Sequence, residues 1–310
     1  MIYKAFLAKC ENRNANPKIN SKAGTPDDWF HSEILSSFNI EGYTFDFFVD
    51  WSKGQISQEV WFKVPYSSYT EEQLKEIFAK DLDDCWSLQY FRKMFKFCEN
   101  IKMDFYFIVF EDNSDWSSYA SELYKVKLYK KDNKLFHTFT KISICEFKEN
   151  IKKLSGGAIN IGAKGLIYGT SKLECYLSNT TSLYPGDADL VLTNNKHEPI
   201  ALIEFKKHTK TTPMKNQQIS NYYPWPDKRK YDRLYKLQKY IESSGYNIPF
   251  FVFYYPTDTM HNTWKLENVK YNGKDFDVLN NELFDLPQVN NMITYKEVVK
   301  IILLKIEEWK

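Results

Sequence analysis

The sequence predicts a mixed α/β protein organised around a β-sheet, and three observations lead to this fold class. Aromatic and β-branched runs of strand length recur along the chain. Longer stretches between them carry apolar residues at helical spacing. In the second half a strand pair is followed by a helical stretch and then by another buried strand, an order typical of a mixed sheet in the α/β or α+β class.

The first half is expected to contain a helix start, a strand pair, a long helix, a buried strand and a hairpin, in that order. Thr25, followed by Pro26 and two acids, is typical of a helix N-terminus. Thr70 and Gln73 have the spacing of a capping box, which begins the long helix. The expected strands lie at 43–51, 58–64 and 103–110, and the two arms of the hairpin lie at 123–129 and 134–144.

The composition changes near residues 150–165, which are rich in Gly, Asn and Lys. We therefore expect an aromatic-rich α+β region at 1–150, which recognises substrate or partner, and a second domain at 151–310. The expected elements of the second domain are a short element, a strand pair, a long helical region, a buried strand, a further strand and a terminal helix, at 171–178, 187–193, 199–206, 214–244, 248–255, 264–271 and 294–309. No internal repeat is visible in the sequence.

Charge, cysteine content and hydropathy narrow the class of protein. There are 42 basic and 40 acidic residues and the net charge is +2, so any surface that binds nucleic acid must be a local one. The five cysteines are scattered without a C-x-x-C pair, which indicates neither a disulfide framework nor a zinc site. No stretch approaches the roughly 20 apolar residues that span a bilayer. We expect a cytoplasmic protein with no membrane partner.

The triplet acid-x-lysine occurs four times, at Asp132-Asn133-Lys134, Glu146-Phe147-Lys148, Glu204-Phe205-Lys206 and Glu308-Trp309-Lys310. Such a triplet can bind a metal ion and a water only where it lies on a buried strand with a second carboxylate on a neighbouring strand. Asp132 falls in the expected hairpin turn, Glu308 lies on the terminal helix, and Glu146 runs into the polar stretch ENIKK. These three acids are interpreted as solvated charges.

Glu204 differs, because the nearly continuous apolar run 199–203 leads into it. Asp187 and Asp189 stand just before another apolar run, 190–192, and the polar stretch TNNKHE can turn the chain back as a hairpin. Alternation along a strand puts Glu204 and Lys206 on one face, and both upstream acids on one face of the partner strand. If the hairpin register matches, the carboxylates converge.

GDADLVL followed by ALIEFKK resembles the PD-(D/E)XK nuclease superfamily, in which an acid opens one strand and an acid-x-lysine closes the next. Gln218-x-x-x-Tyr222 is similar to the Gln-x-x-x-Tyr element on the helix after the lysine strand in RecB-like branches, where a spacing of four puts both side chains on one face. Glu174 lies in a stretch similar to the helix that contributes a further glutamate. The resemblance covers roughly residues 165–256 and implies a restriction-endonuclease-like core with a mixed sheet flanked by helices.

The resemblance also implies the site. Its catalytic set is Asp189, Glu204, Lys206, Glu174 and Gln218, and its metal ligands are Asp189, Glu204 and Glu174. Whether Asp187 or Asp189 is the ligand stays open, although the apolar run directly after Asp189 favours Asp189. Each of these assignments has a structural alternative. Asp189 could be a strand-start or turn acid, and Gln218 could lie on a helix surface. Ser171 and Glu174 have the spacing of a capping box, and Glu204 with Lys206 could form a salt bridge on an edge strand.

Carboxylate ligands suit Mg²⁺, with Mn²⁺ able to substitute, and do not suit zinc. A bound ion would polarise a phosphodiester and lower the pKa of a water, while Lys206 would hold that water and stabilise the extra negative charge of the transition state. The resemblance implies hydrolysis that leaves a 5′-phosphate. We expect a nuclease, with endonuclease action favoured over exonuclease action and DNA favoured over RNA.

A basic and aromatic stripe follows the triplet, in which cations can neutralise phosphates and rings can stack on bases. Its candidate nucleic-acid-binding residues are Lys207, Lys210, Lys215, Tyr222, Trp225, Lys228, Arg229, Lys230 and Arg233. A solvated helix face over a tyrosine-rich core is the plainer interpretation of the same residues. A catalytically inactive relative that binds nucleic acid or protein is the alternative function, and a homodimer stays open.

Overall fold

The computed structural model describes residues 23–66, 70, 72, 73, 76, 86–112, 115–132, 134–159, 171–257, 259–289 and 291–310. Over these residues the protein has a mixed α/β fold, in which ten strands form a mixed sheet in the order β10, β9, β8, β7, β6, β1, β2, β3, β4, β5 and helices cover its faces. The chain divides into two compact units. The described part of the first unit is residues 23–44 and 188–310, and that of the second is residues 45–187.

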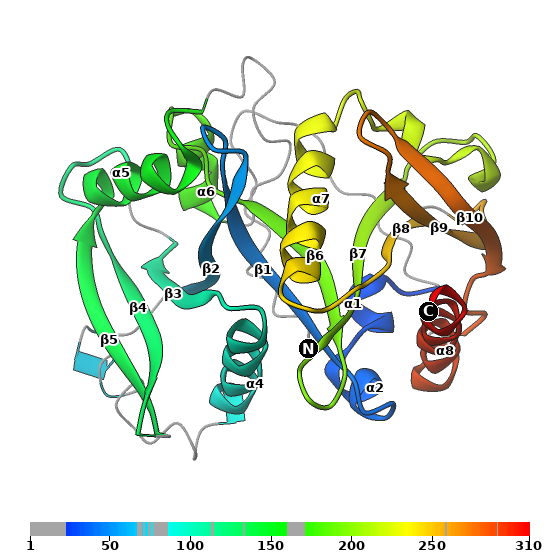
Figure 1. Cartoon of the computed structure of the whole chain (residues 1–310), viewed down its shortest axis with the longest axis horizontal. Helices are drawn as coiled ribbons and strands as arrows, with labels where there is room; N and C mark the ends of the chain where they lie inside the picture. Colours follow the sequence, from blue (N-terminus) through cyan, green and yellow to red (C-terminus); the bar gives the residue numbers. More distant parts are fainter. Residues whose placement is uncertain are drawn as a thin grey trace. The chain divides into compact units, whose positions relative to one another are not determined.

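The first unit contains the strands around the Glu204 triplet (Figure 1). Its elements are α1 (Pro26–Trp29), α2 (Ser32–Ser36), β6 (Gly186–Thr193, which begins in the other unit), β7 (Pro199–His208), the 3₁₀ turns η2 (Met214–Asn216) and η3 (Ile219–Asn221), α7 (Lys228–Ser243), β8 (Phe250–Pro256), β9 (Thr263–Tyr271), β10 (Phe276–Asp285) and α8 (Met292–Trp309). β6 and β7 are antiparallel, and β7 and β8 are parallel neighbours connected through α7.

The second unit contains most of β1 (Glu41–Asp50) and the elements β2 (Gln55–Tyr66), α4 (Trp86–Asn100), β3 (Asp104–Glu111), β4 (Glu122–Lys131), β5 (Lys134–Ser143), α5 (Ile144–Ser155) and α6 (Lys172–Ser178). The strands predicted for this half are confirmed. Its core forms where α5 and α6 pack on the sheet, with Phe147 stacked 5.1 Å from Trp61. On the other face of the sheet, Phe97 of α4 lies 5.6 Å from Phe45.

The two units repeat one order of elements, which the sequence does not reveal. In each, an antiparallel strand pair is followed by a helix, by a strand parallel to the second strand of the pair, by two antiparallel strands and by a helix. The side chains that face the helix between the two parallel strands, α4 or α7, differ between the two units. In the second unit Phe47, Val60 and Phe105 lie in register beside one another and are fully buried.

Two faces of the first unit have different characters. On one face, side chains of β6 to β9 such as Ile203 and Phe251 form a hydrophobic core with helices α1, α2 and α8. Successive residues of a strand point to opposite faces, so Glu204 points to the other face, which α7 covers. There Tyr231 of α7 packs against Phe250. Glu204 and Lys206 therefore lie between the sheet and α7, whereas Phe205 packs into the core on the other face.

The sequence-based prediction was wrong at two places in this unit. The helical region expected from residue 214 begins at Lys228, because Pro224 and Pro226 lack the backbone N–H that a helix interior needs. Residues 214–221 form the two short 3₁₀ turns instead. Strand β10 was not predicted, since apolar and polar residues do not alternate regularly along it and nearly all of it is exposed.

The earlier copy of the triplet has a different structural setting, because Glu146 and Lys148 lie in the first turns of α5 and not on a strand. The Glu146 carboxylate accepts hydrogen bonds from the Ser143 backbone N–H and hydroxyl, both at 2.8 Å, and the Ser143 hydroxyl accepts one from Glu146 N–H. This is a capping box, and it accounts for Glu146 structurally. Among the described helices, none has the length and apolar content needed to cross a membrane.

Candidate functional site

The hairpin of β6 and β7 brings two carboxylates face to face. Leu190 pairs with Ile203 and Val191 with Leu202, so one further step in register puts Asp189 opposite Glu204. Residues directly opposite in adjacent strands point to the same face of the sheet. Asp189 Oδ2 also accepts a hydrogen bond of 2.8 Å from the Phe205 backbone N–H, which fixes its orientation.

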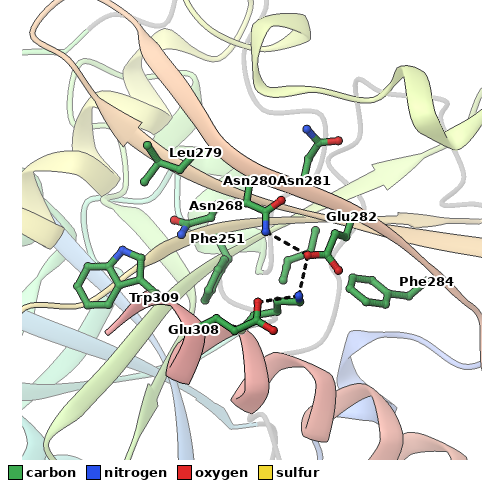
Figure 2. Close-up of a pocket in the computed structure, with 11 residues that line it drawn as sticks. Phe251, Asn268, Leu279, Asn280, Asn281, Glu282, Phe284, Glu308 and Trp309 are labelled. Carbon is green, nitrogen blue, oxygen red and sulfur yellow. Dashed lines mark hydrogen bonds and ion pairs between the residues drawn. The ribbon is translucent and has the colours of Figure 1, made fainter.

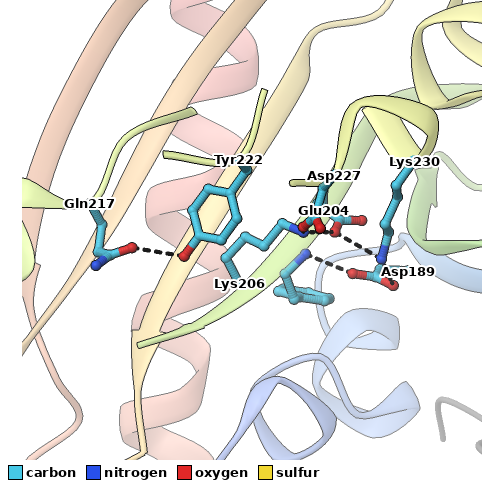
Figure 3. Close-up of polar contacts among 8 residues, drawn as sticks. Asp189, Glu204, Lys206, Gln217, Tyr222, Asp227 and Lys230 are labelled. Carbon is cyan, nitrogen blue, oxygen red and sulfur yellow. Dashed lines mark hydrogen bonds and ion pairs between the residues drawn. The ribbon is translucent and has the colours of Figure 1, made fainter. Parts of the chain in front are cut away.

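An alternating series of charges extends from this pair (Figure 3). Lys230 Nζ lies 2.8 Å from Glu204 Oε1 and 3.3 Å from Asp189 Oδ1. Lys206 Nζ lies 3.1 Å from the same Glu204 oxygen and 2.7 Å from Asp227 Oδ2. Three carboxylates and two ammonium groups thus alternate across β6, β7 and the start of α7.

Burial makes this arrangement unusual for charged residues. The Glu204 side chain has no exposed surface, and that of Lys206 is 10% exposed. A buried carboxylate is strongly disfavoured unless cations or hydrogen bonds stabilise it. Glu204 Oε2 nevertheless lacks a hydrogen-bond partner among the described residues, as does the buried hydroxyl of Tyr231. The site therefore contains a buried carboxylate oxygen and a buried hydroxyl without described hydrogen-bond partners.

Two tyrosines surround the Lys206 ammonium, which lies 4.9 Å from the ring centre of Tyr222 and 5.1 Å from that of Tyr231. Such cation–π contacts attract the ammonium to the faces of the two rings. Burial, aided by the Asp227 charge, raises the pKa of Tyr222 to about 12. Burial, aided by the Glu204 charge, raises the pKa of Tyr231 well above its usual range. Both hydroxyls stay protonated at neutral pH and can donate hydrogen bonds.

The segment after β7 positions Tyr222 in a way that the sequence did not suggest. The Tyr222 hydroxyl donates a hydrogen bond of 2.8 Å to Gln217 Oε1. Gln218 is exposed and stands at the start of η3, so the expected common helix face of Gln218 and Tyr222 is wrong. The reason is the missing helix, since in a 3₁₀ turn or loop a spacing of four residues does not put two side chains on one face.

A buried ion pair anchors this segment to the sheet. Lys265 Nζ lies 2.7 Å from Glu267 Oε1, and both residues are almost fully buried. Glu267 Oε2 accepts hydrogen bonds from Ile219 N–H at 2.9 Å and from the Tyr254 hydroxyl at 2.8 Å. The loop that carries Tyr222 is therefore tied to β9 through the Ile219 backbone N–H.

Glu174 belongs to the second unit, where the structure gives it a local role. Its backbone N–H donates to the Ser171 hydroxyl at 3.1 Å, as the capping interpretation predicts. Its carboxylate lies 3.5 Å from Lys63 Nζ, which also pairs with Asp46 at 3.3 Å. Burial raises the pKa of Asp46 to about 7 although Lys63 opposes the shift, and the charge of Asp187 adds to the rise. A role of Glu174 as a ligand of the Glu204 site stays a prediction.

The candidate nucleic-acid-binding residues differ in exposure and in the direction of their side chains. Lys207, Lys210, Lys215 and Lys228 are exposed, and Tyr222, Arg229 and Arg233 are partly buried. Trp225 is 73% exposed. It lies between Pro224 and Pro226, two residues before Asp227. Lys230 is different, because it points back to the two carboxylates.

Sequence reasoning missed the parts played by Asp227, Lys230 and Tyr231. All three lie at the start of α7, where Asp227 is the residue before the first helical position. The available signal was the short run from Asp227 to Tyr231 after Pro226, which contains all three residues. Their spacing places them at one helix end only if the helix begins at Lys228.

A pocket of about 280 Å³ lies elsewhere in the same unit, against the end of α8 (Figure 2). Phe251 and Leu266 form part of its wall and belong to the core on the α8 face of the sheet. Its charged groups pair with one another, since Lys305 Nζ lies 2.6 Å from Glu282 and 2.7 Å from Glu308. The pocket is therefore separate from the Glu204 site, which lies on the α7 face.

Comparison of the chain with protein-family models, curated proteins and solved structures gives no match. Among the described residues, no group of three or more His, Cys, Asp and Glu side chains is gathered as a ready set of metal ligands. The carboxylates that do converge are those of Asp189 and Glu204, which share Lys230, and Glu204 Oε2 has no hydrogen-bond partner among the described residues. This set suits Mg²⁺, which binds through one or two carboxylates and keeps several of its waters.

Proposed function

We propose that the protein is a divalent-metal-dependent nuclease of the PD-(D/E)XK type, with Mg²⁺ or Mn²⁺ as the cofactor. One observation carries the proposal: a fully buried Glu204 lies opposite Asp189 and two residues before Lys206, on one face of the sheet. The Glu146 copy of the triplet lacks all of this, because it begins a helix. The mixed sheet with helices on both faces of the first unit supports the same assignment.

The chemistry assigns a role to each side chain. Asp189 and Glu204 would hold the ion, which polarises the phosphodiester and lowers the pKa of a bound water. Lys206 is oriented by Glu204 and Asp227, so its ammonium would direct the attacking water and stabilise the negative charge that develops on the phosphoryl oxygens. The protonated hydroxyl of Tyr231, buried and without a partner among the described groups, would supply a further hydrogen bond.

Substrate binding would use the exposed cations and Trp225. Lysine and arginine side chains neutralise phosphates, and an exposed tryptophan can stack on a base with a free energy of about 1–3 kcal/mol. These contacts carry no sequence information, which agrees with a nuclease that recognises the backbone. DNA is favoured over RNA as the substrate, and endonuclease over exonuclease action.

A catalytically inactive nucleic-acid-binding or protein-interaction relative is the second candidate. One observation favours it, because each of the three carboxylates already has a lysine within 3.3 Å. A closed set of ion pairs can stabilise a fold without any catalytic role.

A cleavage assay separates the two candidates. Purified protein is incubated with supercoiled plasmid, linear duplex, single-stranded DNA and RNA, each with Mg²⁺, Mn²⁺ or EDTA. The nuclease assignment predicts cleavage with either metal, none with EDTA, and 5′-phosphate ends that a ligase can rejoin. Binding without cleavage of all four substrates would establish the inactive relative instead.

A further inference from the structure

Lys230 is the second cation of the site, and its side chain points from the first turn of α7 toward the sheet (Figure 3). Its ammonium lies 2.8 Å from Glu204 Oε1 and 3.3 Å from Asp189 Oδ1. One cation is thus shared by oxygens from two carboxylates on neighbouring strands. A divalent ion held by the same two residues would bind the same pair of carboxylates, so it would compete with the Lys230 ammonium for them.

The two lysines of the site differ in how firmly they are held. Each lysine contacts two carboxylates, but Lys206 is only 10% exposed and its ammonium also lies over two tyrosine rings. Lys230 is 26% exposed. A long lysine side chain can move its charged end to solvent while its stem stays packed. Lys230 therefore has a route out of the site, and Lys206 is fixed within it.

The charge balance also favours movement of Lys230 out of the site when a divalent ion binds. Three carboxylates and two lysines leave one net negative charge at the site in the absence of metal. A divalent ion added with both lysines in place would give a net positive charge, with three cations close to Glu204. Departure of Lys230 restores neutrality and removes the repulsion between neighbouring cations.

We propose that Lys230 is a resident counter-ion, which holds Asp189 and Glu204 in ligand geometry in the metal-free protein and is displaced when a divalent ion binds. Lys230 is a positioning residue in this account and does not touch the reacting phosphate. The inference rests on the proposed function, since it concerns the same two carboxylates. It adds that metal binding must compete with an internal cation, which lowers the affinity for the metal.

Calorimetric titration with Mn²⁺ tests this inference on the full chain. Lys230→Met keeps the length of the side chain and removes its charge, Lys230→Arg keeps the charge, and Lys236→Met is the matched control on the same helix. Lys230→Met is expected to bind Mn²⁺ at least tenfold more tightly than the native protein, whereas Lys236→Met is expected to match it and Lys230→Arg to bind no more tightly.

Thermal unfolding in EDTA gives a second readout and verifies that the variants fold. Without metal, Lys230→Met is expected to melt at a lower temperature than the native protein. On addition of Mn²⁺, its melting temperature is expected to rise by more than that of the native protein. A lysine with a purely structural role would give unchanged or weaker Mn²⁺ binding in Lys230→Met, and that result would overturn the inference.

The outcomes for Lys230 and for nuclease activity are distinguishable. Unchanged Mn²⁺ affinity in Lys230→Met, together with metal-dependent cleavage by the native protein, would remove the counter-ion role and leave the nuclease assignment intact. Tighter binding without cleavage of any nucleic acid would support the counter-ion role and contradict the nuclease assignment.

Discussion

Lys206 Nζ lies 2.7 Å from Oδ2 of Asp227, a residue that follows it by 21 positions and precedes the first turn of α7. This contact connects the strand that carries the acid-x-lysine triplet to the helix that covers it. Lys206 therefore has two carboxylate partners, Glu204 and Asp227. Asp227 thereby becomes a positioning residue for the proposed catalytic lysine.

Asp227→Asn is predicted to lower the cleavage rate at least tenfold, because Lys206 loses one of its two carboxylate partners and its orientation. The unfolding free energy is expected to fall by about 1–3 kcal/mol, the usual contribution of a hydrogen bond to a charged group. Asp232→Asn is the matched control, since Asp232 pairs at 2.7 Å with the exposed Lys228 four residues before it in the same helix. Cleavage rates and urea denaturation of the two variants provide the comparison.

The two adjacent glutamines give a prediction that separates the sequence-based assignment from the structural one. Gln217→Ala removes the acceptor of the Tyr222 hydroxyl and is expected to reduce the cleavage rate severalfold. Gln218→Ala is expected to have the smaller effect, because Gln218 is exposed and lies outside the described contacts of Tyr222. A larger loss of activity in Gln218→Ala would show that Gln218, the residue selected by the Gln-x-x-x-Tyr pattern, is the glutamine that supports cleavage.

The buried Lys265–Glu267 pair should matter for stability. Glu267→Gln leaves the Lys265 ammonium buried without a carboxylate, and breaking such a pair typically costs about 3–5 kcal/mol. Glu282→Gln is the control, because it disrupts a more exposed pair with Lys305. Chemical denaturation measures both, and an equal loss in the two variants would contradict the anchoring role of Glu267.

The pH dependence of the unfolding free energy should show the titration of the Asp46 carboxyl group. Its pKa is raised from an ordinary value near 3.8 to about 7 in the folded protein, chiefly by burial. The folded state therefore binds more protons than the unfolded state between these values, so this group's contribution to stability decreases as the pH rises from about 4 to about 7. Asp46→Asn is predicted to flatten the pH profile of the unfolding free energy in that window. An unchanged slope would show that Asp46 titrates normally.

Much of the fold and part of the site could be predicted from the sequence, and the reasons differ by element. The apolar run before Glu204 and the polar turn between the strands are local features, so they predict the hairpin and its facing acids. The course of residues 214–227 depends on two prolines and on the distant Glu267, and Lys230 reaches the site because α7 packs over the strand that carries Glu204. The repeated order of elements is a property of topology, and the buried Phe47, Val60 and Phe105 of the second unit do not resemble the charged residues of the first unit, so the sequence does not indicate it.

The most direct measurement compares Glu204→Gln with Glu146→Gln in the same Mg²⁺-dependent cleavage assay, after thermal unfolding has shown that both are folded. Both changes neutralise the acid of a Glu-Phe-Lys triplet and keep its size. We predict that Glu204→Gln abolishes cleavage and that Glu146→Gln, which loses only part of a helix cap worth about 1 kcal/mol, cleaves at the native rate. Full activity in folded Glu204→Gln would contradict the assignment of the site.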